Sequence, residues 1–136
     1  MTGIQLFVGM VGTAIIVATA GCTAFNTAGE PPEQLVTQQA EQRWQAIIAG
    51  DWKTAYSYAS PAYREAVTLE GFKASVNGPV RRKAVKVKSV ECSEASCTVV
   101  LGMRYEPMMP GYGEMQTEFD EKWVEQDGRW YIYQRL

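Results

Sequence analysis

Two adjacent carboxylates, Asp120 and Glu121, are the side chains of this sequence best placed for proton-transfer chemistry. They lie in a run where Phe119 and Trp123 alternate with polar residues, which is typical of a strand with one buried face. If Phe119 and Trp123 face the core, Glu121 shares that face; if Val124 is the core residue, Asp120 faces inward instead. An inward carboxylate could act as a general acid or base. The alternative is a structural Glu121, either near the rim of the sheet or in an ion pair with one of three arginines: Arg64, Arg81 or Arg82.

The composition excludes several other kinds of chemistry. The 136-residue chain has no His, the commonest general base and metal ligand, and only three Cys. It contains no glycine-rich phosphate loop, nucleophile elbow or metal-binding motif. A net charge of −2 provides no basic field for a nucleic acid. We therefore expect no metal, no cofactor and no nucleic-acid partner.

The N-terminal stretch has the features of a targeting signal. Residues 1–21 have no charged side chain, and small residues end the apolar run, as in a cleaved secretory signal peptide. The segment Ala18-Thr19-Ala20-Gly21-Cys22 resembles the lipobox of bacterial lipoproteins, which implies diacylglycerol on the Cys22 thiol. We expect a signal peptide over 1–21 and a lipidated linker over 22–32. The alternative is an uncleaved N-terminal anchor with Cys22 as an ordinary thiol.

The lipobox resemblance also implies a location. A lipid on Cys22 would tether the protein to a membrane of the bacterial cell envelope. Thr23, rather than Asp, follows the cysteine. By resemblance to Gram-negative lipoproteins, we expect the outer membrane, with the domain facing the periplasm, if the host has two membranes.

Cys92 and Cys97 are the pair that remains if Cys22 carries lipid. In an exported protein an even remainder indicates a disulfide. A redox pair is the alternative, although the spacing is not Cys-x-x-Cys. We expect a structural disulfide that closes a hairpin.

Residues 33–136 form one domain whose first half is helical. Apolar residues at helical spacing predict a helix over 33–49 that ends at Gly50, with five inward residues: Val36, Ala40, Trp44, Ile47 and Ile48. Capping residues Asp51, Ser60 and Thr68 predict shorter helices over 51–59, 61–66 and 68–76.

The second half alternates with period two. This pattern predicts strands over 83–91, 97–106, 117–125 and 129–136, joined by turns at 93–96 and 126–128 and by a longer Met- and Gly-rich loop over 107–116. Helices followed by antiparallel strands make an α+β fold.

A string of residues in the helical half resembles the nuclear transport factor 2-like, or cystatin-like, cone superfamily. The string runs from Trp44 through 49–52, 55–56 and 60–64 to Phe72, and 127–132 resembles the family's closing strands. The resemblance implies helices packed into the hollow of a curved four-stranded antiparallel sheet. It also implies a cavity lined by the inner face of the sheet, for which our candidate ligand-binding residues are Tyr105, Phe119, Glu121 and Trp123.

Two functions are compatible with these features. The first is a membrane-tethered envelope lipoprotein whose domain binds a small apolar ligand or an envelope protein, with the loop over 108–115 as a lip or contact surface. The second is a small cavity enzyme of the isomerase or lyase type that uses Glu121 or Asp120 as acid or base, with help from a Tyr hydroxyl. The family includes both kinds of protein, so the fold does not choose between them.

Overall fold

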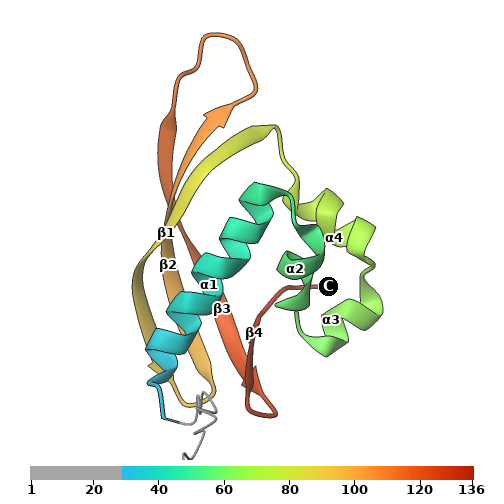
Figure 1. Ribbon diagram of the computed structural model, residues 1–136, viewed down its shortest axis with the longest axis vertical. Coiled ribbons are helices and arrows are strands. Elements are labelled where there is room, and N and C mark those ends of the chain that lie inside the picture. The colour runs from blue at the N-terminus through green and yellow to red at the C-terminus, as the bar shows by residue number, and fades with distance from the viewer. Residues whose placement is uncertain (1–28) are drawn as a thin grey trace, which may run out of the picture.

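The computed structural model describes residues 29–136, and the predicted signal peptide, Cys22 and most of the linker lie outside the described residues. Within 29–136, four helices precede four strands: α1 (Pro32–Ala49), α2 (Trp52–Ser57), α3 (Pro61–Ala66), α4 (Leu69–Val76), β1 (Val80–Ser93), β2 (Ser96–Pro107), β3 (Met115–Gln126) and β4 (Arg129–Ile132). The strands form one antiparallel sheet in the order β1-β2-β3-β4. The helices lie on one side of it (Figure 1). The predicted α+β fold, with helices packed on a curved antiparallel sheet, is confirmed.

The three short helices begin directly after the predicted capping residues. The side chains of Asp51, Ser60 and Thr68 accept hydrogen bonds from the backbone N–H groups of Thr54, Tyr63 and Gly71. Gly50 ends α1 with a left-handed φ of 74°, and its N–H donates to the carbonyls of Ala46 and Ile47. No helix within residues 29–136 is long and apolar enough to cross a membrane.

Two tight turns set the strand register. Asp127 and Gly128 both have positive φ, at 52° and 75°, which a two-residue hairpin turn between twisted strands requires. Cys92 and Cys97 lie opposite each other at the end of the β1–β2 hairpin and form the predicted disulfide, with 4.0 Å between their Cα atoms. Two register shifts in β1 bend the long hairpin.

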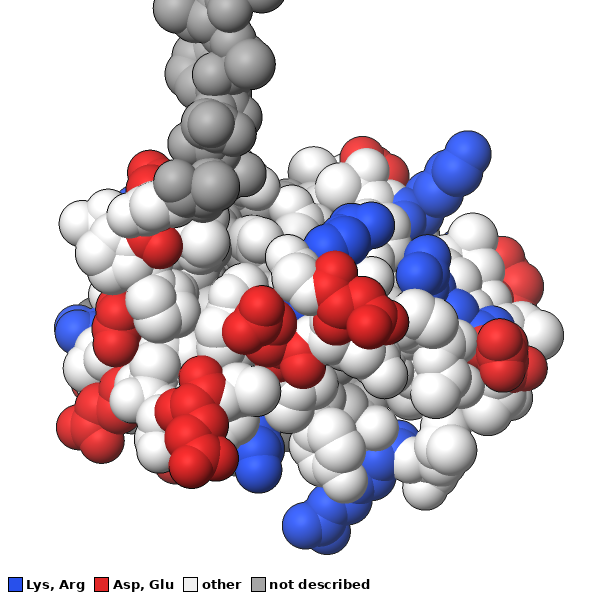
Figure 2. All heavy atoms as spheres, turned by 90° about the horizontal axis from the view of Figure 1, so that it is seen from below, with Lys and Arg blue, Asp and Glu red and all other residues white. Residues whose placement is uncertain are grey.

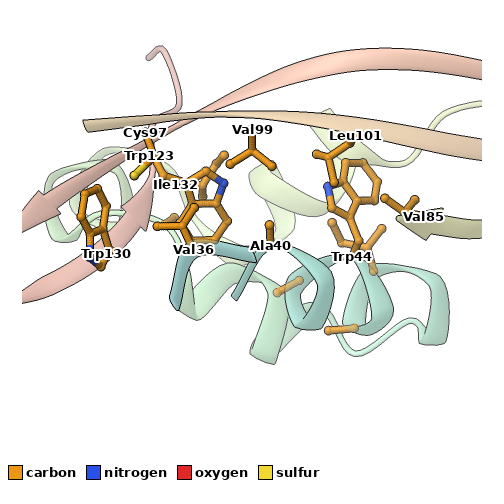
Figure 3. Packing of buried hydrophobic residues seen from close by; sticks show 14 of the residues in the cluster. Val36, Ala40, Trp44, Val85, Cys97, Val99, Leu101, Trp123, Trp130 and Ile132 are labelled. Atoms are coloured by element: carbon orange, nitrogen blue, oxygen red, sulfur yellow. The ribbon is translucent and has the colours of Figure 1, made fainter. Parts of the chain in front are cut away.

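The core lies between α1 and the inner face of the sheet (Figure 3). Val36 and Ala40 of α1 and Val99, Leu101 and Trp123 of the sheet are completely buried. The predicted inward face of β3, with Phe119 and Trp123, is therefore correct. Of the five residues predicted to face inward from the first helix, Ile48 is an exception. It is 38% exposed, because it follows Ile47 by one position and so points about 100° away from it around the helix.

The last strand is shorter than predicted. The period-two pattern extended it to 136, but β4 ends at Ile132, whose N–H donates to the carbonyl of Tyr58. Tyr133 and Leu136 are 53% and 83% exposed. The residues after Ile132 thus bury little apolar surface against the helices. Side-chain packing therefore contributes little free energy to extending the strand beyond Ile132.

Candidate functional site

Glu121 of β3 faces α1, and its carboxylate is enclosed. One oxygen, Oε1, accepts hydrogen bonds from the Arg43 guanidinium at 2.7 Å and from the Trp44 indole N–H at 2.8 Å. The other, Oε2, accepts from the Trp123 indole N–H at 3.3 Å. Asp120 lies on the opposite face of the strand and is exposed. The alternation that placed Glu121 inward with Phe119 and Trp123 is therefore correct.

Arg43 forms the ion pair with the Glu121 carboxylate. Its side chain is 5% exposed and that of Glu121 is 9% exposed, so the ion pair is shielded from water. Burial is the largest influence on Arg43 and lowers the pKa of its guanidinium, while the charge and hydrogen bond of Glu121 oppose that shift. The expected partners Arg64, Arg81 and Arg82 form no ion pair with Glu121. Within the described residues, Arg43 Nε is buried and has no acceptor.

The Tyr hydroxyls that could assist acid-base chemistry make other contacts. Tyr56 donates to the backbone carbonyls of Arg64 and Val67. Tyr58 donates to Gln42 at 2.9 Å, and burial raises the pKa of its hydroxyl. Both hydroxyls therefore join neighbouring helical segments together. Their geometry is that of packing contacts between helices.

Three of the four candidate ligand-binding residues, Phe119, Glu121 and Trp123, lie in the packed layer between α1 and the sheet. Trp123 has no exposed surface. Phe119 packs edge-on against the Trp44 ring, with 5.3 Å between the ring centroids. Tyr105, near the end of β2, is half-buried. In this arrangement Phe119, Glu121 and Trp123 hold α1 to the sheet, and a ligand would reach them only if α1 moved away.

The β2–β3 loop is the place where large apolar side chains gather on the surface. Met108, Met109 and Tyr112 are 65%, 57% and 57% exposed, and Met115 at the start of β3 is 42% exposed. The loop projects from the end of the sheet, beyond the helices (Figure 1). Together with Arg81 and Glu106, it borders a hollow of about 500 Å³. Such an apolar cluster is typical of an interaction surface.

Comparisons with known proteins agree on the fold. No family model matches the sequence, and no curated protein matches it significantly. A SEC-C motif containing protein from Rhodopseudomonas palustris superposes with a TM-score of 0.58 and 16% identity, over 71% of this chain and 73% of that one. A second SEC-C motif containing protein, from Psychrobacter arcticus, gives a TM-score of 0.58 and 12% identity, over 81% of this chain and 63% of that one. At these identities the likeness concerns the fold alone.

A third similar structure is the CamKII hub homology domain of Chlamydomonas reinhardtii. It has a TM-score of 0.47 and 20% identity, over 71% of this chain and 89% of that one.

Sequence reasoning missed Arg43, although a signal was present. Arg43 lies seven residues after Val36 and four before Ile47, so it occupies a position of the buried helical stripe. A charged side chain that is buried costs free energy unless it is paired. This applies to a single charge in the apolar stripe of a helix and to a single carboxylate on the apolar face of a strand. Those two positions mark both side chains as buried charges, and the crossing of α1 over the sheet brings them together.

Proposed function

We propose that this protein is a membrane-tethered envelope lipoprotein whose folded domain binds a partner protein through the β2–β3 loop. The observation that carries the proposal is the exposed apolar cluster of Met108, Met109, Tyr112 and Met115. Met side chains are flexible and polarisable, so they adapt to irregular apolar partners. Exposing such a cluster to water is costly in solubility, which favours a loop that is covered in use.

The packing of the inner face supports binding rather than turnover. Glu121 accepts three hydrogen bonds from Arg43, Trp44 and Trp123, and the ion pair is almost fully buried. A substrate that used this carboxylate would first have to displace a buried arginine. That step leaves a buried charge without its partner and costs about 3–5 kcal/mol. Asp120, the other candidate, is exposed on the far face of the sheet.

The position of the loop favours a protein partner over the membrane itself. Glu33 at the start of α1 lies beside Val90, whereas Val80 and the loop lie at the other end of β1 (Figure 1). Ten residues of strand separate Val80 from Val90, a distance of about 33 Å. As a random coil, the predicted linker of about ten residues after Cys22 would have a root-mean-square length of about 16–19 Å, roughly half of that separation. A tethered domain would therefore present its loop away from the bilayer.

Photo-crosslinking in intact cells tests the proposal. Met109 and Tyr133 have nearly equal exposure, at 57% and 53%, but Met109 lies in the β2–β3 loop and Tyr133 follows the end of β4. We expect a benzoylphenylalanine at position 109, but not at 133, to yield a discrete protein adduct after irradiation. Adducts formed only with lipid, or the same adducts from both positions, would refute loop-mediated protein binding.

A further inference from the structure

The β2–β3 loop forms one side of a longer groove. A second hollow, of about 300 Å³, lies between the C-terminal end of α1 and the start of β1, with Ile48, Trp52 and Val80 among its lining residues. Met108 and Arg81 border both this hollow and the larger one under the loop. The two hollows therefore meet at these side chains. The combined groove has apolar walls at both ends and room for several side chains of a bound segment.

The groove is positively charged. Arg81, Arg82 and Glu106 line it, and Lys83 pairs with Glu106, so three cations stand against one carboxylate, an excess of two positive charges. Arg81 is 3.7 Å from Glu106, but Lys83 shares that carboxylate at 3.1 Å. Arg82 forms no ion pair with any carboxylate in the described part of the chain. One carboxylate thus serves two of the cations that flank the apolar groove.

The opposite end of the domain has the opposite charge. Figure 2 looks at the end where α1 begins and shows acidic side chains spread across it, together with several basic ones. The β1–β2 and β3–β4 turns lie at this end (Figure 1) and carry exposed carboxylates: Glu91, Glu94, Glu125 and Asp127. An acidic partner would be repelled from this end and attracted to the loop end.

We infer that the groove binds a polypeptide segment in which large apolar side chains are flanked by Asp or Glu. The apolar side chains would cover Met108, Met109 and Ile48, and the carboxylates would pair with Arg81 and Arg82. This inference rests on the proposed function and specifies its partner by chemical class. The charges of the groove speed the approach of an acidic segment and discriminate against other segments. The apolar contacts supply most of the binding free energy.

Selection of peptides on the full-length protein in detergent micelles tests the inference. The probe is a phage-displayed library of random 12-residue peptides. We expect enriched peptides to combine at least two large apolar residues with one or more Asp or Glu. Met109→Glu should weaken their binding at least tenfold, because it places a charge in the apolar contact. Arg81→Glu should weaken it about threefold or more, as expected for one partly exposed ion pair together with the repulsion that replaces it.

Matched controls separate the possible failures. Tyr133→Glu changes an equally exposed apolar residue, and Lys86→Glu reverses an exposed charge on the outer face of the sheet; both should bind the peptides normally. One outcome would overturn the inferred partner class but support the proposed surface. In it, Met109→Glu weakens peptide binding, but the peptides show no preference for Asp or Glu and Arg81→Glu has no effect. Peptides indifferent to Met109→Glu would overturn the surface itself. Binding of the loop to phosphatidylglycerol vesicles, abolished by Met109→Glu, would replace the protein partner with a lipid surface.

Discussion

The buried ion pair between Arg43 and Glu121 should dominate the stability of the domain. Replacing Glu121 with Ala leaves the Arg43 guanidinium, whose side chain is 5% exposed, without a counter-charge. It also removes the acceptor of the Trp44 and Trp123 indole N–H groups. We expect Glu121→Ala to fold less stably by about 3–5 kcal/mol. That loss is a large part of the 5–15 kcal/mol that typically separates folded from unfolded domains.

A double-mutant cycle separates the charge interaction from the loss of packing. Arg43→Met keeps most of the aliphatic volume and leaves the carboxylate buried, whereas Glu121→Gln keeps one acceptor oxygen for an indole. The double variant buries no unpaired charge. We therefore expect its loss of stability to be smaller than the sum of the two single losses by about 2 kcal/mol, within the range for residues in direct contact.

Urea denaturation followed by Trp fluorescence measures these changes. With an m-value of about 2 kcal/mol/M, Glu121→Ala should lower the midpoint by about 1.5 to 2.5 M. Arg104→Met is the matched control, since its ion pair with Glu114 is about half exposed and should contribute little. A Glu121→Ala midpoint near that of the wild type, or strictly additive single losses, would refute the reasoning that this pair holds α1 to the sheet.

Three further predictions concern other parts of the chain. Cys22→Ser should release the protein from membranes or leave an unprocessed precursor, and intact mass should show diacylglycerol on the wild-type residue; an unlipidated mature protein that starts elsewhere would contradict this. Reducing the Cys92–Cys97 disulfide should cost about 2 kcal/mol, because the closed loop is short; we expect a lower melting temperature with the fold retained, and two free thiols in protein purified without reductant would argue against the bond. Hydrogen bonds from Thr54 lower the pKa of Asp51, so the stability they contribute is present above its ordinary pKa of 3.8 and is lost as pH falls through the lowered folded value. Asp51→Asn keeps the cap oxygen without the titration, so its melting temperature should vary less between pH 2.5 and 5 than that of the wild type, and identical profiles would exclude the effect.

The local structure could be predicted from the order of the residues alone. Asp51, Ser60 and Thr68 placed the helix starts because a cap is a hydrogen bond between residues three apart. Asp127-Gly128 placed the last hairpin turn because few other residue pairs adopt two positive φ angles. Alternation put Glu121 on the buried face because strand side chains have a period of two.

What those buried faces contact depends on the fold of the whole domain. Arg43 and Glu121 are 78 residues apart, and the choice of Arg43 over other arginines depends on where α1 crosses the sheet. Whether the inner face is hollow or filled depends on the same distance between helix and sheet, and here Trp44, Phe119 and Trp123 fill it. The exposure of Met109 follows from a loop that extends past the helices. Long-range packing of this kind leaves no periodic signal along the chain, because its partners are selected by shape and burial in three dimensions.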